Sequence, residues 1–498
     1  MREITPDYQS VTGRVIGNAQ FAAGALTENL VTHPNPFDAR LGDTKRVAVP
    51  IALPGASRTR LRHDAAQRGH VRRRRQLVLA LNIVTVLALV AAMVGVLSYG
   101  GILGAEWVML AAYTVTLPWL SIGLWNSVIG FWLDRKYGAR AAKHVAPVIG
   151  RPTGVEPITT RVAIVMPLRN EDPTGSLASL RTLQAELSRT PYGRFFDFHV
   201  LSDTDDAAIA LQEEAGIARW QHHAPVFYRR RTDNAGYKAG NIAEFVHRCG
   251  DDYDFFLPLD ADSVMGAETV LRMVRIMQAA PELGILQSLV TGLPSKTFFT
   301  RAFQFGMRHG MRAYTLGSAW WQADCGPNWG HNCLIRTAPF RAHCMLPVLD
   351  GTGPLSGYIL SHDQLEAALM RSAGYEVRVL AEETESQEAN PPSLADFIRR
   401  DLRWCYGNMQ YWKLLRIGGL APVSRLQLYL AIQMYLAAPA WMVFIFGGAW
   451  LATQSDQVAG VPLWAGLGLF ALLMTLNLFP KLMGLAQILA DPHRAATY

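Results

Sequence analysis

The sequence predicts an α/β domain with a mostly parallel sheet, inserted between two pairs of transmembrane α-helices. Charged residues make up only 17% of the 498 residues, whereas hydrophobic residues make up 50%. Long apolar stretches lie on both sides of a central region in which short apolar runs alternate with helical patterns. This length and composition predict more than one domain, one part in a membrane and one part in water.

The membrane part is predicted from four uncharged stretches. Residues 76–98 and 107–133 form the first pair, which we place at 76–133. The second pair falls within residues 428–490. At about 1.5 Å per residue each stretch can cross a hydrocarbon core of about 30 Å. Lys and Arg flank each pair but are absent from the short links, so the termini and the central region are expected to be cytoplasmic. Buried core helices are the alternative, and the consistent flanks disfavour it.

Residues 1–75 are predicted to form a cytoplasmic, partly disordered region that becomes basic from Arg58 onward. The arginines at 72–75 either contact anionic lipid or act as a topology signal. The net charge of +7 is modest and lies near apolar segments, which favours membrane lipid and excludes nucleic acid as the partner. The five cysteines form no Cys-x-x-Cys pair, so we expect reduced thiols and no zinc site.

The central stretch is Tyr253 to Val264, in which an apolar run ends in Asp260-Ala-Asp262. The run has the length of a buried strand. Carboxylates at its end supply the hard oxygen ligands that suit Mg²⁺ or Mn²⁺ shared with a substrate diphosphate. An isolated Asp-x-Asp is more typical of a solvated turn, so the metal-site interpretation depends on the residues around it.

Polar residues follow four consecutive predicted strands, which end near residues 166, 201, 228 and 259. In a parallel sheet the carboxyl ends of strands lie at one edge, where α/β proteins bind ligands. Each residue taken alone has an alternative role as a turn or helix cap. Together they predict a nucleotide-binding site. The site lies within a domain that spans residues 161–417 and follows a linker at 134–160. The residues concerned are Asn170, Glu171, Asp203, Lys238, Asp260 and Asp262.

This set resembles the inverting family 2 glycosyltransferases of GT-A fold, which share a strand-end Pro-x-x-Asn-Glu, an early Asp, a Lys-Ala-Gly segment and an Asp-x-Asp. The resemblance implies that Asp203 binds the uridine and that Lys238 binds the phosphate region. It also implies that Asp260 and Asp262 hold the sugar nucleotide through Mg²⁺, with Mn²⁺ as the alternative. Asn170 and Glu171 would belong to the same nucleotide-sugar site.

A later motif resembles the catalytic segment of processive members. Ser361-His362-Asp363 opens a predicted helix, and in the family the corresponding Asp is the catalytic base. An inverting transfer needs such a base to take the proton of the acceptor hydroxyl. Taken alone, Asp363 is also typical of a helix cap.

Arg400-Asp-Leu-Arg403-Trp404 resembles the (Gln/Arg)-x-x-Arg-Trp signature of processive synthases. On a helix the two arginines lie one turn apart and share a face. The resemblance implies that they contact the leaving diphosphate while Trp404 stacks on an acceptor sugar. An amphipathic helix at the membrane surface, over residues 396–415, is the alternative, and both descriptions can hold.

Longer segments around these motifs resemble the osmoregulated periplasmic glucan glucosyltransferase H family. The matching segments are Pro167-x-x-Asn-Glu-Asp172, Tyr228-Arg-Arg-Arg231, Leu259-Asp-Ala-Asp-Ser-Val-Met265, Trp329-Gly-His-Asn332, Ser361-His-Asp363 and Arg403-Trp-Cys-x-Gly-Asn408. The resemblance implies a processive enzyme of the bacterial inner membrane that extends a growing glucan from UDP-glucose and exports it. It also implies acyl carrier protein and a periplasmic glucan-processing protein as partners. His331 would lie near the acceptor, or else in a structural turn.

Two alternatives remain open at this point. One is another family 2 membrane synthase that makes a different polysaccharide or glycolipid. The other is a catalytically degenerate membrane or transport component, which should have lost part of the site. No such loss has occurred at Asp203, Asp260, Asp262, Asp363 or Arg403. Because members of the family carry further membrane spans, we expect the chain to be truncated after residue 498.

Overall fold

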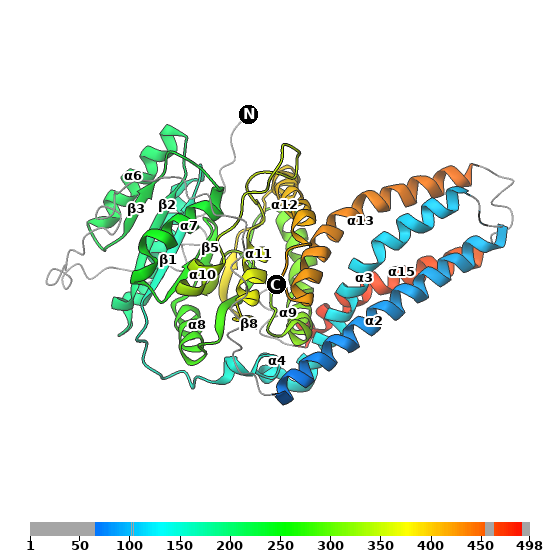
Figure 1. Cartoon of the computed structure of the whole chain (residues 1–498), viewed down its shortest axis with the longest axis horizontal. Coiled ribbons are helices and arrows are strands. Elements are labelled where there is room, and N and C mark those ends of the chain that lie inside the picture. Colours follow the sequence, from blue (N-terminus) through cyan, green and yellow to red (C-terminus); the bar gives the residue numbers. More distant parts are fainter. Residues whose placement is uncertain (1–64, 101, 103, 454–462, 491–498) are drawn as a thin grey trace.

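The computed structural model describes residues 65–100, 102, 104–453 and 463–490 of the chain. A domain built around one sheet lies on one side, and four long helices extend away from it on the other (Figure 1). The predicted disorder of residues 1–64 and the basic side chains of Arg58, Arg60 and Arg62 lie outside the described residues.

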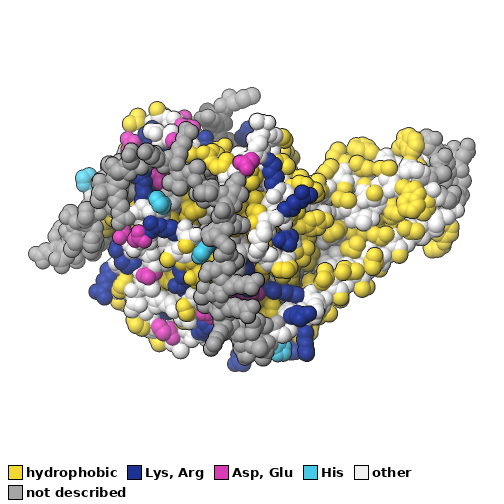
Figure 2. All heavy atoms as spheres, in the orientation of Figure 1, with side chains coloured by type: hydrophobic (Ala, Val, Ile, Leu, Met, Phe, Trp, Pro, Cys, Tyr) yellow, Lys and Arg dark blue, Asp and Glu magenta, His cyan; other side chains and the backbone are white. Residues whose placement is uncertain are grey.

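Four helices of the described chain are long and apolar enough to cross a membrane. They are α2 (Ala65–Leu97), α3 (Gly104–Tyr137), α13 (Pro422–Ala452) and α15 (Leu463–Leu489). They coincide with the four predicted stretches, and α2 begins earlier in the sequence than expected. Hydrophobic side chains cover most of the visible surface of this bundle, whereas charged side chains gather on the sheet domain (Figure 2).

The sheet has the order β3-β2-β1-β4-β7-β6-β8-β5. Its first half is the predicted parallel α/β arrangement, in which β1 (Val162–Leu168) lies between β2 (Phe196–Ser202) and β4 (Phe255–Pro258). β3 (Phe227–Arg230) extends it beside β2. The predicted fold class is confirmed, although the second half of the sheet is mixed. That half contains β5 (Ser263–Met265), β6 (Leu283–Gly292), β7 (Cys333–Arg336) and β8 (Glu376–Glu388).

Alternating residues of β1 fill two hydrophobic layers, because successive side chains of a strand point to opposite faces. Ile164 and Met166 belong to the layer that includes α5 (Pro173–Ser188) and α8 (Ala267–Ala279). Ala163 and Val165 belong to the opposite layer. That layer includes α7 (Tyr237–Cys249), α10 (Thr337–His343), α11 (Asp363–Ser372) and part of α12 (Leu394–Leu414). Strands covered on both faces read as continuous apolar runs, which is why the sequence reveals them.

The sequence analysis missed α9 (Phe298–Gln322), which joins the sheet domain to the membrane helices. Asp134 of α3 accepts two hydrogen bonds from Arg312 of α9, at 2.9 and 2.7 Å, and one from Gln487 of α15 at 2.7 Å. The two backbones approach closely at Gly130 and Gly317. An added Cβ at Gly130 would overlap the carbonyl oxygen of Ala313.

Replacing Gly130 with Ala is expected to destabilise the protein by about 1–3 kcal/mol, because α9 must move to admit the methyl group. Gly123→Ala on the same helix is the matched control, since nothing lies within 4 Å of its Cβ position. That control should be neutral or slightly stabilising, because Ala favours helix more than Gly does. The measurement is the thermal midpoint in detergent, and equal midpoints for the two variants would contradict the close approach.

Arg75 contacts the sheet domain, a role that neither predicted alternative for residues 72–75 includes. Its guanidinium lies 2.6 Å from Asp324 and donates to the carbonyls of Trp321 and Gln322. Asp324 also pairs with Arg371 of α11 at 2.5 Å. The base of the first membrane helix is therefore joined to α11 through Asp324.

Candidate active site

The predicted strand-end residues gather at one edge of the sheet. Because β1, β2 and β3 are parallel and in register, Leu168, Ser202 and Arg230 reach this edge side by side. Backbone hydrogen bonds extend the alignment past the strands, from the Asp203 amide to the Leu168 carbonyl at 2.7 Å and from the Arg231 amide to the Ser202 carbonyl at 2.9 Å. The edge is therefore a fixed platform for the side chains that follow it.

Asp203 is buried in a two-pronged ion pair with Arg231, at 2.6 and 2.7 Å. It does not cap the following helix, α6 (Ala207–Gln221), whose cap is Asp206. Arg231 also donates to the carbonyls of Ala235 and Tyr237, which precede Lys238. The pair therefore fixes both the end of β2 and the loop that enters α7.

Asn170 serves mainly to brace this platform. Its backbone has a φ of 58°, a left-handed conformation that Asn tolerates better than most residues. Its side-chain nitrogen donates to Asp205 at 2.6 Å, and its side-chain oxygen accepts from the amides of Asp205 and Asp206 at 3.1 Å. The amide group thus ties the end of β1 to the loop after β2.

Glu171 faces the carboxylates of the Asp-x-Asp segment. Enclosure of its carboxyl group among protein atoms, followed by repulsion from Asp260 and Asp262, raises the pKa of Glu171 to about 7, although the Arg169 amide acts in the opposite direction. Part of the side chain remains open to solvent. Three carboxylates, those of Glu171, Asp260 and Asp262, are therefore close enough at this edge of the sheet to repel one another.

Lys238 lies in the first turn of α7 and joins the two halves of the site. Its ammonium pairs with Asp260 and donates to the carbonyl of Gly330 at 3.0 Å. The residue before it, Tyr237, has a left-handed backbone with φ of 53°, which is uncommon outside functional sites and turns. The helix N-terminus adds further positive potential near the ammonium, an arrangement that favours an anion such as a diphosphate.

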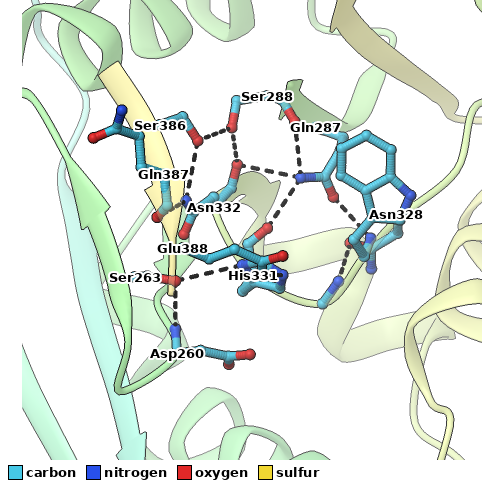
Figure 3. Close-up of polar contacts among 12 residues, drawn as sticks. Asp260, Ser263, Gln287, Ser288, Asn328, His331, Asn332, Ser386, Gln387 and Glu388 are labelled. Carbon is cyan, nitrogen blue, oxygen red and sulfur yellow. Dashed lines mark hydrogen bonds and ion pairs between the residues drawn. The ribbon is translucent and has the colours of Figure 1, made fainter. Parts of the chain in front are cut away.

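Asp260 lies at one end of a polar network that reaches β8 (Figure 3). The Asp260 amide donates to Ser263 Oγ at 3.1 Å, and this oxygen lies 3.4 Å from His331 Nδ1. His331 Nε2 in turn lies 3.2 Å from Glu388, which pairs with Ser263 across β5 and β8. Burial and then repulsion from Asp260 and Glu388 raise the pKa of Asp262 to about 6.

The donor set at Asp260 and Asp262 fits a hard divalent cation. Carboxylate oxygens are suitable ligands, and the raised pKa of Asp262 indicates negative charge that a cation would relieve. Within the described residues, no three acidic, His or Cys side chains are already grouped to hold a metal ion. A cation at this place would therefore draw ligands from a substrate as well, which is usual for Mg²⁺ with phosphates.

Asp363 is the first residue of α11 and borders the loop that binds Lys238. The preceding His362 holds the N-cap position but makes no side-chain cap hydrogen bond. A Cβ added to Gly330 would lie only 3.2 Å from the Asp363 Cβ. Burial raises the pKa of Asp363 above the ordinary range of an aspartate, while the His362 imidazole opposes this. The carboxyl group is therefore more basic than that of an exposed Asp and lies beside the Gly330 loop.

Helix α12 docks beside Asp363 through its second half. Gln410 donates to the Tyr358 carbonyl at 2.9 Å, and the Tyr411 hydroxyl donates to the Ser361 carbonyl at 2.7 Å. A Cβ on Gly407 would collide with Ser361, so the helix and this segment are in direct contact. The docking places the second half of α12 against the segment that carries Asp363.

Arg400, Arg403 and Trp404 lie on the first half of α12. The Arg400 guanidinium lies 4.6 Å from the Trp404 ring centre, and its buried Nε has no hydrogen-bond partner in the described part of the chain. Arg403 and Trp404 are exposed. Neither arginine is paired with a strand-end carboxylate among the described residues, so the structure does not join this motif to the rest of the site.

Known families match most of the domain and part of the membrane region. Residues 163–344 match the family described as glycosyl transferase family 2, and residues 255–482 match glycosyl transferase family group 2. The chain therefore contains a glycosyltransferase family 2 domain.

Its curated relatives include glucans biosynthesis glucosyltransferase H of Vibrio cholerae serotype O1, which is 36% identical over 456 residues. That alignment covers 87% of this chain and 62% of the relative. The protein of the same name from Shewanella oneidensis is 37% identical over 415 residues, covering 80% of this chain and 56% of the relative. The chain thus spans about three fifths of the length of the curated relatives that it matches.

Among solved structures, the chain is similar to a mannosyltransferase from Pyrobaculum calidifontis, solved with GDP-Man and Mn²⁺. The TM-score is 0.41 at 16% identity, and the match covers 74% of this chain and 99% of the other.

Several residues of the candidate site were missed by the sequence analysis. Arg231 ends a run of three arginines that begins within β3, and that run was the available signal. Glu388 gave no signal, because its place beside Ser263 depends on a pairing between distant strands. Asn328 and Glu366, which lie behind the loop of Gly330, were missed for the same reason.

Proposed function

We propose that the chain is a processive, inverting glucosyltransferase that uses UDP-glucose to extend the backbone of osmoregulated periplasmic glucan. The observation that carries the proposal is the loop at Gly330. Its carbonyl binds the Lys238 ammonium, and its Cα packs against Asp363. A group suited to the leaving diphosphate and a group suited to the acceptor proton therefore lie on two sides of one short loop. The name shared by the relatives supports glucose as the sugar and glucan as the product.

In the proposed reaction, the UDP moiety lies along the edge of the sheet. Asp203, held by Arg231, accepts from the uracil or ribose, while Asn170 and Glu171 line the same nucleotide-sugar site. Lys238 and the Asp260–Asp262 pair hold the diphosphate. A Mg²⁺ or Mn²⁺ ion bound by these two carboxylates would neutralise charge on the leaving diphosphate. Each of these roles is a proposal that the positions described above support.

The acceptor hydroxyl attacks the anomeric carbon of glucose from the face opposite the diphosphate. As the new C–O bond forms, the bond to UDP breaks, and the hydroxyl proton passes to Asp363. Arg400 and Arg403 would stabilise the departing diphosphate, and the unpartnered Nε of Arg400 supports such a contact. Trp404 and His331 would border the growing glucan.

The proposed location is the bacterial inner membrane, with the catalytic domain and both termini in the cytoplasm and the glucan exported to the periplasm. Support comes from the four membrane-length helices and from the distribution of Lys and Arg around them. Membrane lipid, the growing glucan, acyl carrier protein and a periplasmic glucan-processing protein complete the proposed partners.

The donor is tested with purified protein in nanodiscs and labelled UDP-glucose, UDP-galactose and UDP-N-acetylglucosamine in parallel. We expect polymer from UDP-glucose alone, digestible by glucanases, and a loss of transfer of at least about 10²-fold after metal removal by EDTA. Restoring Mg²⁺ should recover the activity, which is the control for damage by the chelator. Label from another donor would indicate a different family 2 synthase, and binding of UDP without transfer from any donor would contradict the proposal.

A further inference from the structure

A buried carboxylate lies one helical turn behind the proposed base and has no role in the mechanism above. Glu366 of α11 is only 4% exposed. One of its oxygens lies 2.9 Å from His362 Nδ1, and the other accepts a hydrogen bond from Asn328 at 3.4 Å. A buried carboxylate is costly unless it is well partnered, so its two partners must keep their places.

Asn328 extends this chain of contacts toward Lys238, the residue proposed to bind the diphosphate. Its side-chain oxygen accepts from the Gly330 amide at 3.0 Å, and the Gly330 carbonyl accepts from Lys238 at 3.0 Å. Lys238 then pairs with Asp260. A continuous chain of polar contacts thus runs from Glu366 to the Asp-x-Asp segment, and Asn328 within it is completely buried.

The same loop is held from its other side by the sheet (Figure 3). The side chain of Gln287, on β6, accepts from the Trp329 amide at 2.8 Å and donates to the His331 carbonyl at 3.0 Å. Gly330 itself has a φ of 77°, and a Cβ there would lie 3.3 Å from the His362 ring. The loop is therefore clamped between the sheet and α11, and its place depends on both.

From this geometry we propose that Glu366 is a positioning residue that sets the spacing between Asp363 and Lys238. It binds His362, the neighbour of the base, and through Asn328 it fixes the carbonyl that holds the Lys238 ammonium. The inference rests on the proposed function, because it concerns the base and the diphosphate group of that reaction. Misplacing reacting groups by about 1 Å can lower a rate by about 10²-fold.

The test compares Glu366→Ala, Glu366→Gln and Asn328→Ala in the full chain. Glu366→Ala and Asn328→Ala should each lower kcat by about 10–100-fold, while the KM for the donor and the affinity for UDP change less than about threefold. In Glu366→Gln the amide oxygen can accept from Asn328 and the amide nitrogen can donate to a neutral His362. This variant should keep kcat within about fivefold, the worth of one neutral hydrogen bond.

Ser372→Ala is the matched control on the same helix. It removes hydrogen bonds to the carbonyls of Ala368 and Gly419, far along α11 from the base, and kcat should not change. The double variant Glu366→Ala/Asn328→Ala should lose no more activity than the more damaged of the two single variants, because both residues belong to one chain of contacts. If Glu366→Ala does not fold, Asn328→Ala gives the same comparison, since it leaves the Glu366–His362 pair intact.

The outcomes separate the two proposals. Turnover by the unsubstituted protein together with unchanged kcat in Glu366→Ala and Asn328→Ala would overturn the positioning role alone. Losses that multiply in the double variant, or a Glu366→Gln as damaged as Glu366→Ala, would also overturn it. If the unsubstituted protein transfers sugar from no donor, the proposed function fails, and the positioning role fails with it.

Discussion

Replacing Asp363 with Asn is expected to lower kcat by about 10²–10⁴-fold, the usual contribution of a general base. The amide cannot take the proton of the acceptor hydroxyl, whereas its size and its place at the start of α11 are unchanged. UDP should still bind, because Asp203, Arg231 and Lys238 are not altered. The measurement is UDP release from the donor, with UDP affinity determined by calorimetry on the same preparation.

The control for this substitution is Asp350→Asn, an exposed carboxylate on the loop that precedes Asp363. It removes the same charge at a position outside the candidate active site, so kcat should stay unchanged. An Asp363→Asn variant with nearly full activity would exclude Asp363 as the base. Loss of UDP binding in parallel with activity would instead assign Asp363 to the donor site, or show that the substitution disturbs the domain.

The parallel half of the sheet could be predicted because its information is local. β1, β2 and β4 are short, mainly apolar runs, and polar residues of the site follow each of the strands from β1 to β4 before the next helix begins. β8 was missed for the opposite reason. It is a long strand with many charged residues, and its partners β5 and β6 lie far away in the sequence. α9 is amphipathic, so its helical pattern was present in the sequence and was not used. Its close approach to α3 at Gly130 and Gly317 is a tertiary contact that no periodicity reveals.

The candidate site divides in the same way. Asp260, Asp262 and Asp363 stand in short motifs whose residue types already indicate their chemistry. Arg231, Glu366 and Glu388 acquire their positions only through tertiary contacts, so composition and spacing could not identify them. The structure excludes a helix-cap role for Asp203, because Asp206 caps α6. Asp363 lies one residue after the N-cap position of α11, which His362 occupies without a side-chain cap hydrogen bond.

Replacing Arg231 with Ala is expected to destabilise the sheet domain by about 3–5 kcal/mol, because Asp203 then stays buried without a countercharge. The side chains of Asp203 and Arg231 are only 4% and 8% exposed. A change of this size should lower the thermal midpoint by roughly 6–20 °C in a domain of this length. A thiol-reactive dye can report unfolding, since Cys249, Cys333 and Cys344 are buried in the domain.

The matched control is Arg399→Ala, which breaks an ion pair with Asp396 on α12. There the arginine side chain is 81% exposed and the aspartate 40% exposed, so the loss should be below about 0.5 kcal/mol. A midpoint for Arg231→Ala no lower than that of the control would contradict a stabilising role for the buried pair.

The double variant Asp203→Ala/Arg231→Ala separates stability from nucleotide binding. Removing both charges removes the cost of the unpaired carboxylate, so the midpoint should recover part of the loss seen in Arg231→Ala. UDP affinity should not recover, because the acceptor oxygens proposed for the uracil or ribose are gone. If binding returns together with stability, Asp203 acts only in holding the fold, and the nucleotide must be recognised by other groups at this edge of the sheet.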